Sequence, residues 1–274
     1  MDTSSYRHSA PLRGFTLTEL VVAVAIVALL SGMLFPMFAQ SREKARSSTC
    51  ESNLRQIGLG LIGYSQDYDG QLPPAWIGWS ANPAVSVPFP GTARWMDVEQ
   101  PYVKNTEIFT CPDSQTKYTP VPPDRIVSET NPATGQPYAA ENGGYSMNVT
   151  YYSDPHVHPP TPVFDQPGNG RRSLSNIADP AGTAYIFDFH NGQASFQCAW
   201  SAGGQTQPRI DNNAHPRTLG GGGWLVELHN GRLNTEFCDG HVKSVDLDFL
   251  TQPGKIVEDG VPDYCHFTIE NDCP

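Results

Sequence analysis

Residues 20–39 read LVVAVAIVALLSGMLFPMFA, a run without a single charged side chain. About 20 apolar residues in an α-helix are enough to cross the hydrocarbon core of a membrane. No other stretch of the 274-residue chain is comparably apolar. The run therefore predicts one membrane-spanning helix near the N-terminus.

The composition gives the character of the remaining chain. The 28 acidic residues outnumber the 17 basic ones, the net charge is −11, and no run of Lys or Arg occurs. Because a nucleic-acid site needs a basic face, this balance argues against nucleic acid as a partner. Only 16% of the residues are charged, whereas Gly and Pro contribute 25 residues each. These values indicate a loop-rich ectodomain with β-structure rather than a helical bundle.

The apolar run has three interpretations. One is a cleaved signal peptide, for which residues 39–41 (AQS) offer a small-residue cleavage site. The run is longer than the usual core of a signal peptide, however, and Glu19 stands directly before it. The second interpretation is a plain single-pass anchor. The third depends on the residues in front of the run.

Residues 13–20 read RGFTLTEL. This segment closely resembles the processing site of type IV pilins and type II secretion pseudopilins, in which a membrane peptidase cuts after the glycine and methylates the new N-terminal amine. The resemblance implies that the leader ends at Gly14 and that the mature chain begins at Phe15. It also implies that Glu19 is the assembly glutamate of the family and that Pro36 is the proline that many of these helices carry. The partners it implies are prepilin peptidase and a pilus or secretion assembly platform.

A carboxylate at the edge of a membrane-spanning helix is unfavourable unless it is protonated, reaches the headgroups or meets a cation. The amine freed at Phe15 is the cation at comparable depth. We therefore expect the amine of an incoming subunit to meet Glu19 of a neighbour, which would fix the axial register of a filament. The alternative is that Glu19 only faces the lipid headgroups.

We expect four segments: a leader at 1–14, a membrane-spanning and filament-core helix at 15–40, an amphipathic helix at 41–69, and a loop-rich β ectodomain at 70–274. The amphipathic helix carries an apolar stripe at helical spacing, formed by Leu54, Ile57, Leu61, Tyr64 and Tyr68. A short helix is expected near 93–104, strands are expected at 144–149, 183–189, 224–229, 234–238 and 241–246, and 191–223 reads as a surface excursion. A small antiparallel sheet laid on the stripe gives the α+β class.

The best-defined local feature is a hairpin in residues 234–245, NTEFCDGHVKSV. Asp239-Gly240 favours a two-residue type I′ turn. This turn predicts the cross-strand pairs Cys238 with His241, Phe237 with Val242, Glu236 with Lys243, and Thr235 with Ser244. Phe237 and Val242 would then share one face, and Glu236 and Lys243 would form an ion pair on the other. His229, Asp239 and Gly240 resemble the His-x9-Asp-Gly signature that closes many pilin-like proteins of unknown function.

Six cysteines accompany the exported domain: Cys50, Cys111, Cys198, Cys238, Cys265 and Cys273. These cysteines predict up to three disulfides. No two of them have the CxxC spacing of a zinc or thioredoxin-like site. We expect Cys50 on the helix to pair with Cys111, and Cys265 or Cys273 to hold the C-terminal tail.

Aspartates and histidines gather late in the chain. Weak candidates for metal ligands are Asp188, His190, His229, Asp239 and His241. Related major pseudopilins bind calcium in a C-terminal loop, but the pattern of that loop is not reproduced in this sequence. Turn and hydrogen-bonding roles are therefore the preferred expectation, with calcium as the alternative and no other cofactor.

No Gly-x-Ser-x-Gly, His-Glu-x-x-His or Walker A sequence is present, so no enzyme is indicated. The sequence predicts a pilin or pseudopilin that polymerises with copies of itself through its N-terminal helix. Before assembly it would lie in the lipid of the inner (cytoplasmic) membrane, and afterwards in a cell-surface filament or a periplasmic pseudopilus. The alternative is a membrane-anchored minor pilin or surface binding module that forms no homopolymer.

Overall fold

The structure is a computed structural model that describes residues 15–73, 75–77, 93–120, 143–150, 163–164, 173–189, 195–197, 209–219, 225–258, 261–267 and 273–274. The chain divides into two compact units, Met1–Arg42 and Glu43–Pro274. One long helix, α1 (Leu17–Asp67), begins in the first unit and ends in the second.

The first unit contains the apolar part of α1, and the helix continues through Pro36. Apart from Leu59 and Tyr68, every large apolar side chain that is exposed in the described residues lies between Phe15 and Phe38. This part of α1 is apolar around its whole circumference, and the helix is long and apolar enough to span a membrane. The long N-terminal helix that the sequence predicts is therefore confirmed.

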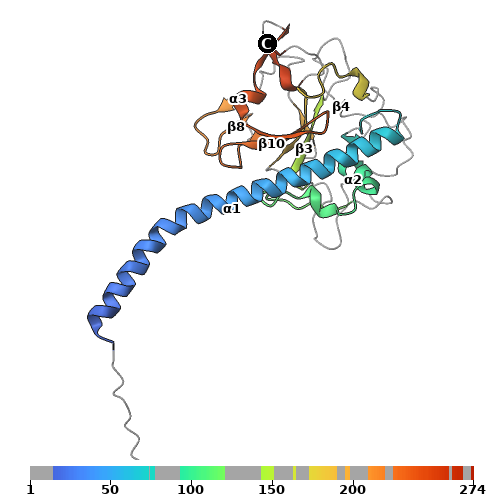
Figure 1. Cartoon of the computed structure of the whole chain (residues 1–274). Helices are drawn as coiled ribbons and strands as arrows, with labels where there is room; N and C mark the ends of the chain where they lie inside the picture. Colours follow the sequence, from blue (N-terminus) through green and yellow to red (C-terminus); the bar gives the residue numbers. More distant parts are fainter. Residues whose placement is uncertain are drawn as a thin grey trace, which may run out of the picture. The chain divides into compact units, whose positions relative to one another are not determined.

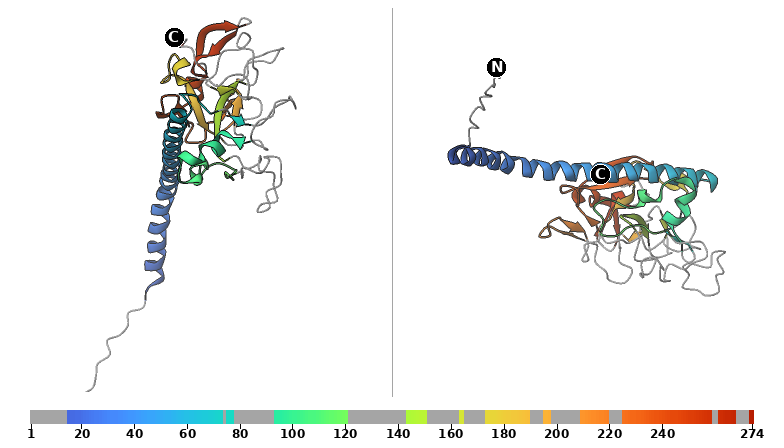
Figure 2. Two further views of the ribbon diagram at one scale, coloured as in Figure 1. Left: turned by 90° about the vertical axis from the view of Figure 1, so that its right-hand side faces the viewer. Right: turned by 90° about the horizontal axis from the view of Figure 1, so that it is seen from below.

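The second unit contains the amphipathic part of α1. Figures 1 and 2 show this part lying along one side of the unit. Its stripe is buried at Leu54, Ile57, Leu61 and Tyr64, as the spacing predicts. Tyr68 departs from the prediction, because it is 44% exposed. Its ring stacks on the outside of that of Tyr64, with centroids 4.2 Å apart. The buried part of the stripe therefore ends at Tyr64, one turn earlier than expected.

The largest sheet in the described residues has six strands in the order β11-β10-β5-β3-β4, and β6 also pairs with β3. The first four strands are antiparallel neighbours, whereas β4 and β6 run parallel to β3. Figure 1 shows β3 and β10 beside α1. The strands are β3 (Tyr145–Thr150), β4 (Val163–Phe164), β5 (Ala184–Asp188), β6 (Ser195–Gln197), β10 (Leu233–Phe237) and β11 (Val242–Val245). A long helix with mainly antiparallel sheets confirms the α+β class.

Smaller sheets and helices complete the second unit. The strand sets are β1 (Trp76–Ile77) with β2 (Ala93–Arg94), β7 (Ile210–Asp211) with β8 (Thr218–Leu219) and β9 (Leu225–Val226), and β12 (Pro253–Glu258) with β13 (Val261–Tyr264). The short helices are α2 (Trp95–Glu99), η1 (Gln100–Tyr102), η2 (Thr106–Phe109), η4 (Leu174–Asn176), α3 (Leu247–Leu250) and η5 (Cys265–Phe267). Residues 191–223 are not only a surface excursion, since they contribute β6, β7 and β8 to sheets.

The central strands are buried on both faces. Every residue of β5 and of β10 is buried. One face packs on the stripe of α1 in a cluster that includes Trp95, Phe109, Tyr145, Met147 and Ile186. The opposite face packs in a second cluster that includes Phe187, Phe189, Leu233, Phe237, Leu250 and Phe267. Strand β10 therefore has no face toward solvent, and its polar side chains, those of Asn234, Thr235 and Glu236, are buried.

The predicted register of the β10–β11 hairpin is wrong by one residue. Strand β10 pairs Glu236 with Val242 and Thr235 with Lys243. The connection has three residues, because the backbone N–H of Gly240 donates to Phe237 O at 2.8 Å and that of Phe237 donates to His241 O at 2.9 Å. A type I′ turn needs positive φ at both central residues, and within the connection only Gly240 has it, with φ +86°.

The shifted register separates the residues that were expected to share a face. Phe237 belongs to the second cluster, whereas Val242 packs against the first. Glu236 is only 1% exposed, so it forms no surface ion pair with Lys243. The ammonium of Lys243 instead lies 4.4 Å from the ring centroid of Phe249. The predicted Glu236–Lys243 ion pair is therefore wrong.

Two disulfides lie in the described residues. Cys50 on α1 pairs with Cys111, as expected from the sequence, and Cys265 pairs with Cys273. The two C-terminal cysteines thus bind each other rather than a residue elsewhere. Cys238 is a free and buried thiol, and Cys198 lies outside the described residues.

Candidate functional site

The first candidate site is the N-terminal end of α1. Gly14 lies outside the described residues, and Phe15 is fully accessible, at 88% exposure. The backbone N–H and hydroxyl of Thr16 donate to Glu19 Oε2 at 2.9 and 2.8 Å, and the N–H of Glu19 donates to Thr16 Oγ1 at 3.3 Å. This reciprocal arrangement is a capping box, which satisfies two backbone donors at the helix start. Sequence reasoning missed this role, although Thr-x-x-Glu before an apolar run is its signal.

The second candidate site surrounds His229. The segment before β10 is held by a tight turn, because His229 and Arg232 exchange backbone hydrogen bonds of 2.9 and 3.1 Å. The two residues between them, Asn230 and Gly231, have φ angles of +54° and +77°. These are the positive angles that a type I′ turn requires. A turn of the type that sequence reasoning expected at Asp239-Gly240 thus forms at Asn230-Gly231, before β10.

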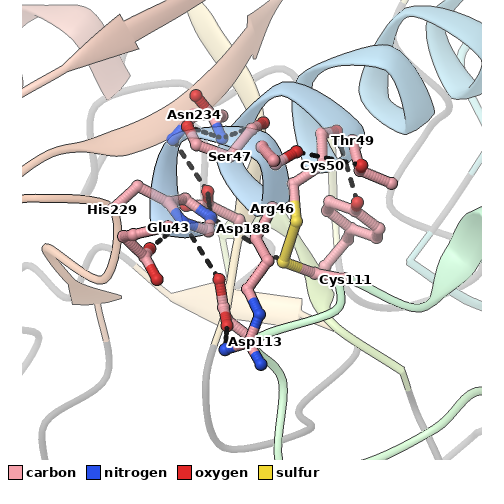
Figure 3. A network of polar contacts seen from close by, with 12 residues as sticks. Glu43, Arg46, Ser47, Thr49, Cys50, Cys111, Asp113, Asp188, His229 and Asn234 are labelled. Atoms are coloured by element: carbon pink, nitrogen blue, oxygen red, sulfur yellow. Dashed lines mark hydrogen bonds and ion pairs between the residues drawn. A yellow bond between two sulfur atoms is a disulfide. The ribbon is translucent and has the colours of Figure 1, made fainter. Parts of the chain in front are cut away.

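Three carboxylates surround the imidazole of His229 (Figure 3). His229 Nδ1 lies 2.9 Å from Glu43 Oε1 and 3.3 Å from Asp113 Oδ2. His229 Nε2 lies 3.1 Å from Asp188 Oδ2. The ring is 1% exposed and Asp188 is fully buried, whereas Glu43 is 24% exposed. The ring therefore joins α1, the segment after Cys111 and the end of β5.

These neighbours change the proton affinity of the ring. Burial is the largest single influence and lowers the pKa of His229. The hydrogen bond and charge of Asp188, the hydrogen bond of Glu43 and the charge of Asp113 together outweigh it and raise the pKa to about 9. Without another cation, the ring is therefore an imidazolium at neutral pH. Its positive charge lies among the three carboxylates.

The start of β10 is tied to the same place. The backbone N–H of Asn234 donates to Asp188 Oδ2 at 2.9 Å, and its side-chain amide donates to Ser47 O on α1 at 3.3 Å. Arg46 Nη1 contacts Asp113 Oδ1 at 2.5 Å. The Cys50–Cys111 disulfide lies beside the ring, with Cys111 Sγ 3.7 Å from His229 Nε2. Helix, sheet and disulfide therefore meet at His229 (Figure 3).

The far end of the His-x9-Asp-Gly signature also contacts α1. A Cβ added to Gly240 would lie 3.0 Å from Ile62 Cδ1. Asp239 Oδ1 accepts a hydrogen bond from the backbone N–H of His241 at 3.1 Å, which stabilises the turn. His229 thus contacts α1 at one end of β10, and Gly240 packs closely against α1 at the other end. This is a role in positioning the sheet on the helix.

The five weak metal candidates do not form one cluster. Asp188 and His229 meet at the start of β10, whereas Asp239 and His241 form an exposed pair of their own after its end, with Oδ1 and Nδ1 2.6 Å apart. His190 lies outside the described residues. Sequence reasoning also missed Glu43 and Asp113, which had no signal beyond their charge.

Two more acidic groups lie inside the second unit. Glu99 and Glu236 are fully buried, and both oxygens of Glu99 and Oε2 of Glu236 make no hydrogen bond with the described residues. Both carboxyl groups fit because α1 carries glycine beside them. A Cβ on Gly60 would collide with Glu99 Oε1, and one on Gly58 would lie 2.5 Å from Glu236 Oε1. Burial raises the pKa of each carboxyl well above its usual range, and neighbouring acidic charges raise it further.

Glu236→Gln is expected to flatten the pH dependence of stability and to stabilise the protein at neutral pH. The unfolded chain releases the Glu236 proton near pH 4.5, whereas the folded chain retains it. The folded state thus binds more protons, and the free energy of unfolding falls as pH rises above this value. Glutamine is neutral at every pH and should remove up to about 1.4 kcal/mol per pH unit of this decline.

Chemical unfolding of the full chain in detergent micelles at several pH values between 4 and 8 measures this effect. The matched control is Glu107→Gln, since Glu107 is exposed. A Glu236→Gln variant with the same pH slope as the wild type would mean that this carboxylate is ionised in the folded protein.

Two family models match the chain. One, described as the prokaryotic N-terminal methylation motif, matches residues 13–35. The other, described as a protein of unknown function (DUF1559), matches residues 39–86. No curated protein and no solved structure gives a significant match.

The methylation motif confirms the prepilin-type N-terminus that the resemblance implied. With the long apolar helix, it indicates a structural pilin-like protein rather than an enzyme, and one anchored in a membrane before assembly. The motif also implies processing by prepilin peptidase and assembly into a pilus-like structure.

Proposed function

We propose that the mature chain is the structural subunit of a type IV pilus-like or pseudopilus-like filament, and that it polymerises through the first part of α1. The observation that carries the proposal is the methylation motif at 13–35 joined to a helix whose apolar side chains are exposed from Phe15 to Phe38. Exposed apolar surface of this extent needs lipid or another protein to cover it. Copies of the same helix in a bundle supply that cover outside the membrane.

Glu19 gives the assembly its register in this proposal. Cleavage after Gly14 frees the amine of Phe15, which carries a positive charge. Within one chain Glu19 Oε2 accepts the hydrogen bonds of Thr16 in the capping box. A carboxylate has two oxygens and about four acceptor positions, so Glu19 can keep these bonds and also accept one from the amine of a neighbouring subunit. The resulting ion pair would be desolvated among apolar helices, where a carboxylate without a partner is strongly disfavoured.

The subunits would associate head to tail, since the amine and the carboxylate lie on different subunits. Such a heterologous contact does not close on itself and produces a helical filament. The second unit would then lie outside the helix bundle. The inner (cytoplasmic) membrane is the proposed location before assembly, and a cell-surface filament or periplasmic pseudopilus is the proposed location afterwards.

The test is to shear the surface of cells that express the native gene and to examine the released material by electron microscopy and mass spectrometry. Fibres whose main component is this chain, beginning with a methylated Phe15, are the expected result. A chain that is cleaved but stays in the membrane fraction as a minor component would contradict the homopolymer. That outcome would support the alternative, a membrane-anchored minor pilin or binding module.

A further inference from the structure

We propose that His229, Glu43 and Asp113 bind a divalent transition-metal ion of the zinc class. The ligand atoms would be His229 Nδ1, Glu43 Oε1 and Asp113 Oδ2, which all lie within 4.8 Å of one another. The proposal concerns the second unit only and does not depend on whether the chain polymerises.

The spacing of the three atoms suits a metal. Nδ1 lies 2.9 Å from Glu43 Oε1 and 3.3 Å from Asp113 Oδ2. Zinc binds histidine nitrogen and carboxylate oxygen at about 2.0–2.2 Å, which places two neighbouring ligand atoms about 3–3.5 Å apart. A small inward shift of Asp113 or Glu43 is enough to complete the three contacts. The partial exposure of Glu43 leaves a side from which the ion, and a water molecule as fourth ligand, can approach.

A buried oxygen that pairs with the charge of the ring but makes no hydrogen bond points to the same position. Asp113 is 10% exposed, and its Oδ2 is buried without a hydrogen bond to the described residues. Its other oxygen is taken by Arg46. The single proton on His229 Nδ1 can be donated to Glu43 at 2.9 Å, which leaves Asp113 Oδ2 without a donor. A buried oxygen in this state is costly, and a metal ion at the shared position would satisfy it.

The opposite side of the ring is built as metal-binding histidines usually are. His229 Nε2 lies 3.1 Å from Asp188 Oδ2, which is fully buried and is itself held by the backbone N–H of Asn234 at 2.9 Å. Such a carboxylate fixes the tautomer that leaves Nδ1 free to bind a metal, and it makes the ring a stronger donor. The metal replaces the proton on Nδ1, and that proton leaves to solvent.

Charge and donor type select the ion. Three carboxylates face the ring, and one guanidinium, that of Arg46, neutralises part of their charge. Around a neutral imidazole the site is therefore net acidic, which favours a cation. Calcium and magnesium prefer oxygen ligands only, whereas imidazole favours zinc and its neighbours. The other two groups with suitable spacing contain the cysteines of the two disulfides, whose sulfur atoms carry no charge.

The test uses the full chain in detergent micelles, stripped of metal by a chelator and then titrated with Zn²⁺. One Zn²⁺ per chain retained after desalting is the expected result, together with a higher melting temperature. Glu43→Gln and Asp113→Asn should each weaken Zn²⁺ binding at least tenfold and reduce the rise in melting temperature. Asp188 contacts the other side of the ring and does not bind the ion, so Asp188→Asn should weaken Zn²⁺ binding by about 10–100-fold.

The matched control is His241→Gln, since His241 forms an exposed pair with Asp239. It should bind Zn²⁺ as the wild type does, whereas His229→Gln should not. Glu43 is partly exposed, so Glu43→Gln gives an answer even if a substitution at His229 prevents folding. Zn²⁺ binding that Glu43→Gln and Asp113→Asn leave unchanged would overturn the proposal. So would the absence of a retained ion, or displacement of Zn²⁺ by an equal concentration of Ca²⁺.

Discussion

Glu19→Gln is expected to reduce the yield of sheared filaments at least about 100-fold while cleavage after Gly14 continues. Removing one partner of a desolvated ion pair leaves the other charge unpaired, which costs about 3–5 kcal/mol and corresponds to two or more orders of magnitude in association. Glutamine is chosen because it can still serve in a capping box. The variant thus removes the charge and keeps the start of α1.

Thr16→Ala is the matched control, because it weakens the helix cap and keeps the charge of Glu19. It removes the hydroxyl that donates to Glu19 at 2.8 Å and accepts from the N–H of Glu19, but it keeps the carboxylate. Loss of a cap typically destabilises a helix by about 1 kcal/mol. Filament yield should therefore fall far less than in Glu19→Gln. Mass spectrometry of the N-terminus must show methylated Phe15 in both variants, so that a processing defect is recognised.

The pair of variants separates two roles of Glu19. If assembly survives in Glu19→Gln and fails in Thr16→Ala, Glu19 acts by capping the helix and the proposed contact with a neighbouring amine is wrong. If both assemble normally, neither role limits filament formation, and Glu19 serves only at the membrane surface.

The local patterns of the sequence were enough to predict the main elements. The helix α1 was predicted from 20 residues without charge and from the helical spacing of apolar residues after them. The bounds of β3, β5, β10 and β11 were predicted to within one or two residues from alternating or apolar runs. These signals are short-range, because helix and strand periodicity is written into neighbouring residues. The α+β class rests on the same elements.

The hairpin register shows the limit of this reasoning. Asp-Gly permits a two-residue turn, but Asn230-Gly231 permits it as well, and only the second adopts it. The choice depends on tertiary contacts. The β10 register that the structure adopts sends Glu236 and Asn234 toward α1, where Gly58 leaves room and Ser47 accepts a hydrogen bond. Because a shift of one residue moves every side chain to the other face, one wrong turn overturned all four predicted pairs.

The site around His229 could be predicted only in part. His229 and Asp188 were recognised as chemistry-bearing residues, but Glu43 and Asp113 are separated from His229 by 186 and 116 positions in the sequence. No pattern in a single sequence links such distant residues. The Cys50–Cys111 disulfide brings them together, since Cys50 comes two turns of α1 after Glu43 and Cys111 lies two residues before Asp113.

Replacing Cys50 and Cys111 by alanine is accordingly expected to lower the free energy of unfolding by about 4 kcal/mol. In the chain-entropy model a disulfide restricts the unfolded chain more strongly as its loop lengthens. The loop closed by Cys50 and Cys111 spans 61 residues, whereas that closed by Cys265 and Cys273 spans 8. The same relation gives about 2.5 kcal/mol for the shorter loop, so Cys265→Ala with Cys273→Ala is the first comparison.

Cys238→Ala is the second comparison, because Cys238 is a buried thiol without a cross-link and its loss reports on packing alone. We expect about 1 kcal/mol for it. Urea unfolding of the full chain in micelles, monitored by near-UV circular dichroism, measures all three variants, and the m-value reports any change in the unfolded state. If the Cys50 and Cys111 variant loses no more stability than Cys238→Ala, the cross-link does not hold η2 and the segment after it on α1. In that case the position of Asp113 beside His229 must depend on Arg46 and the surrounding core instead.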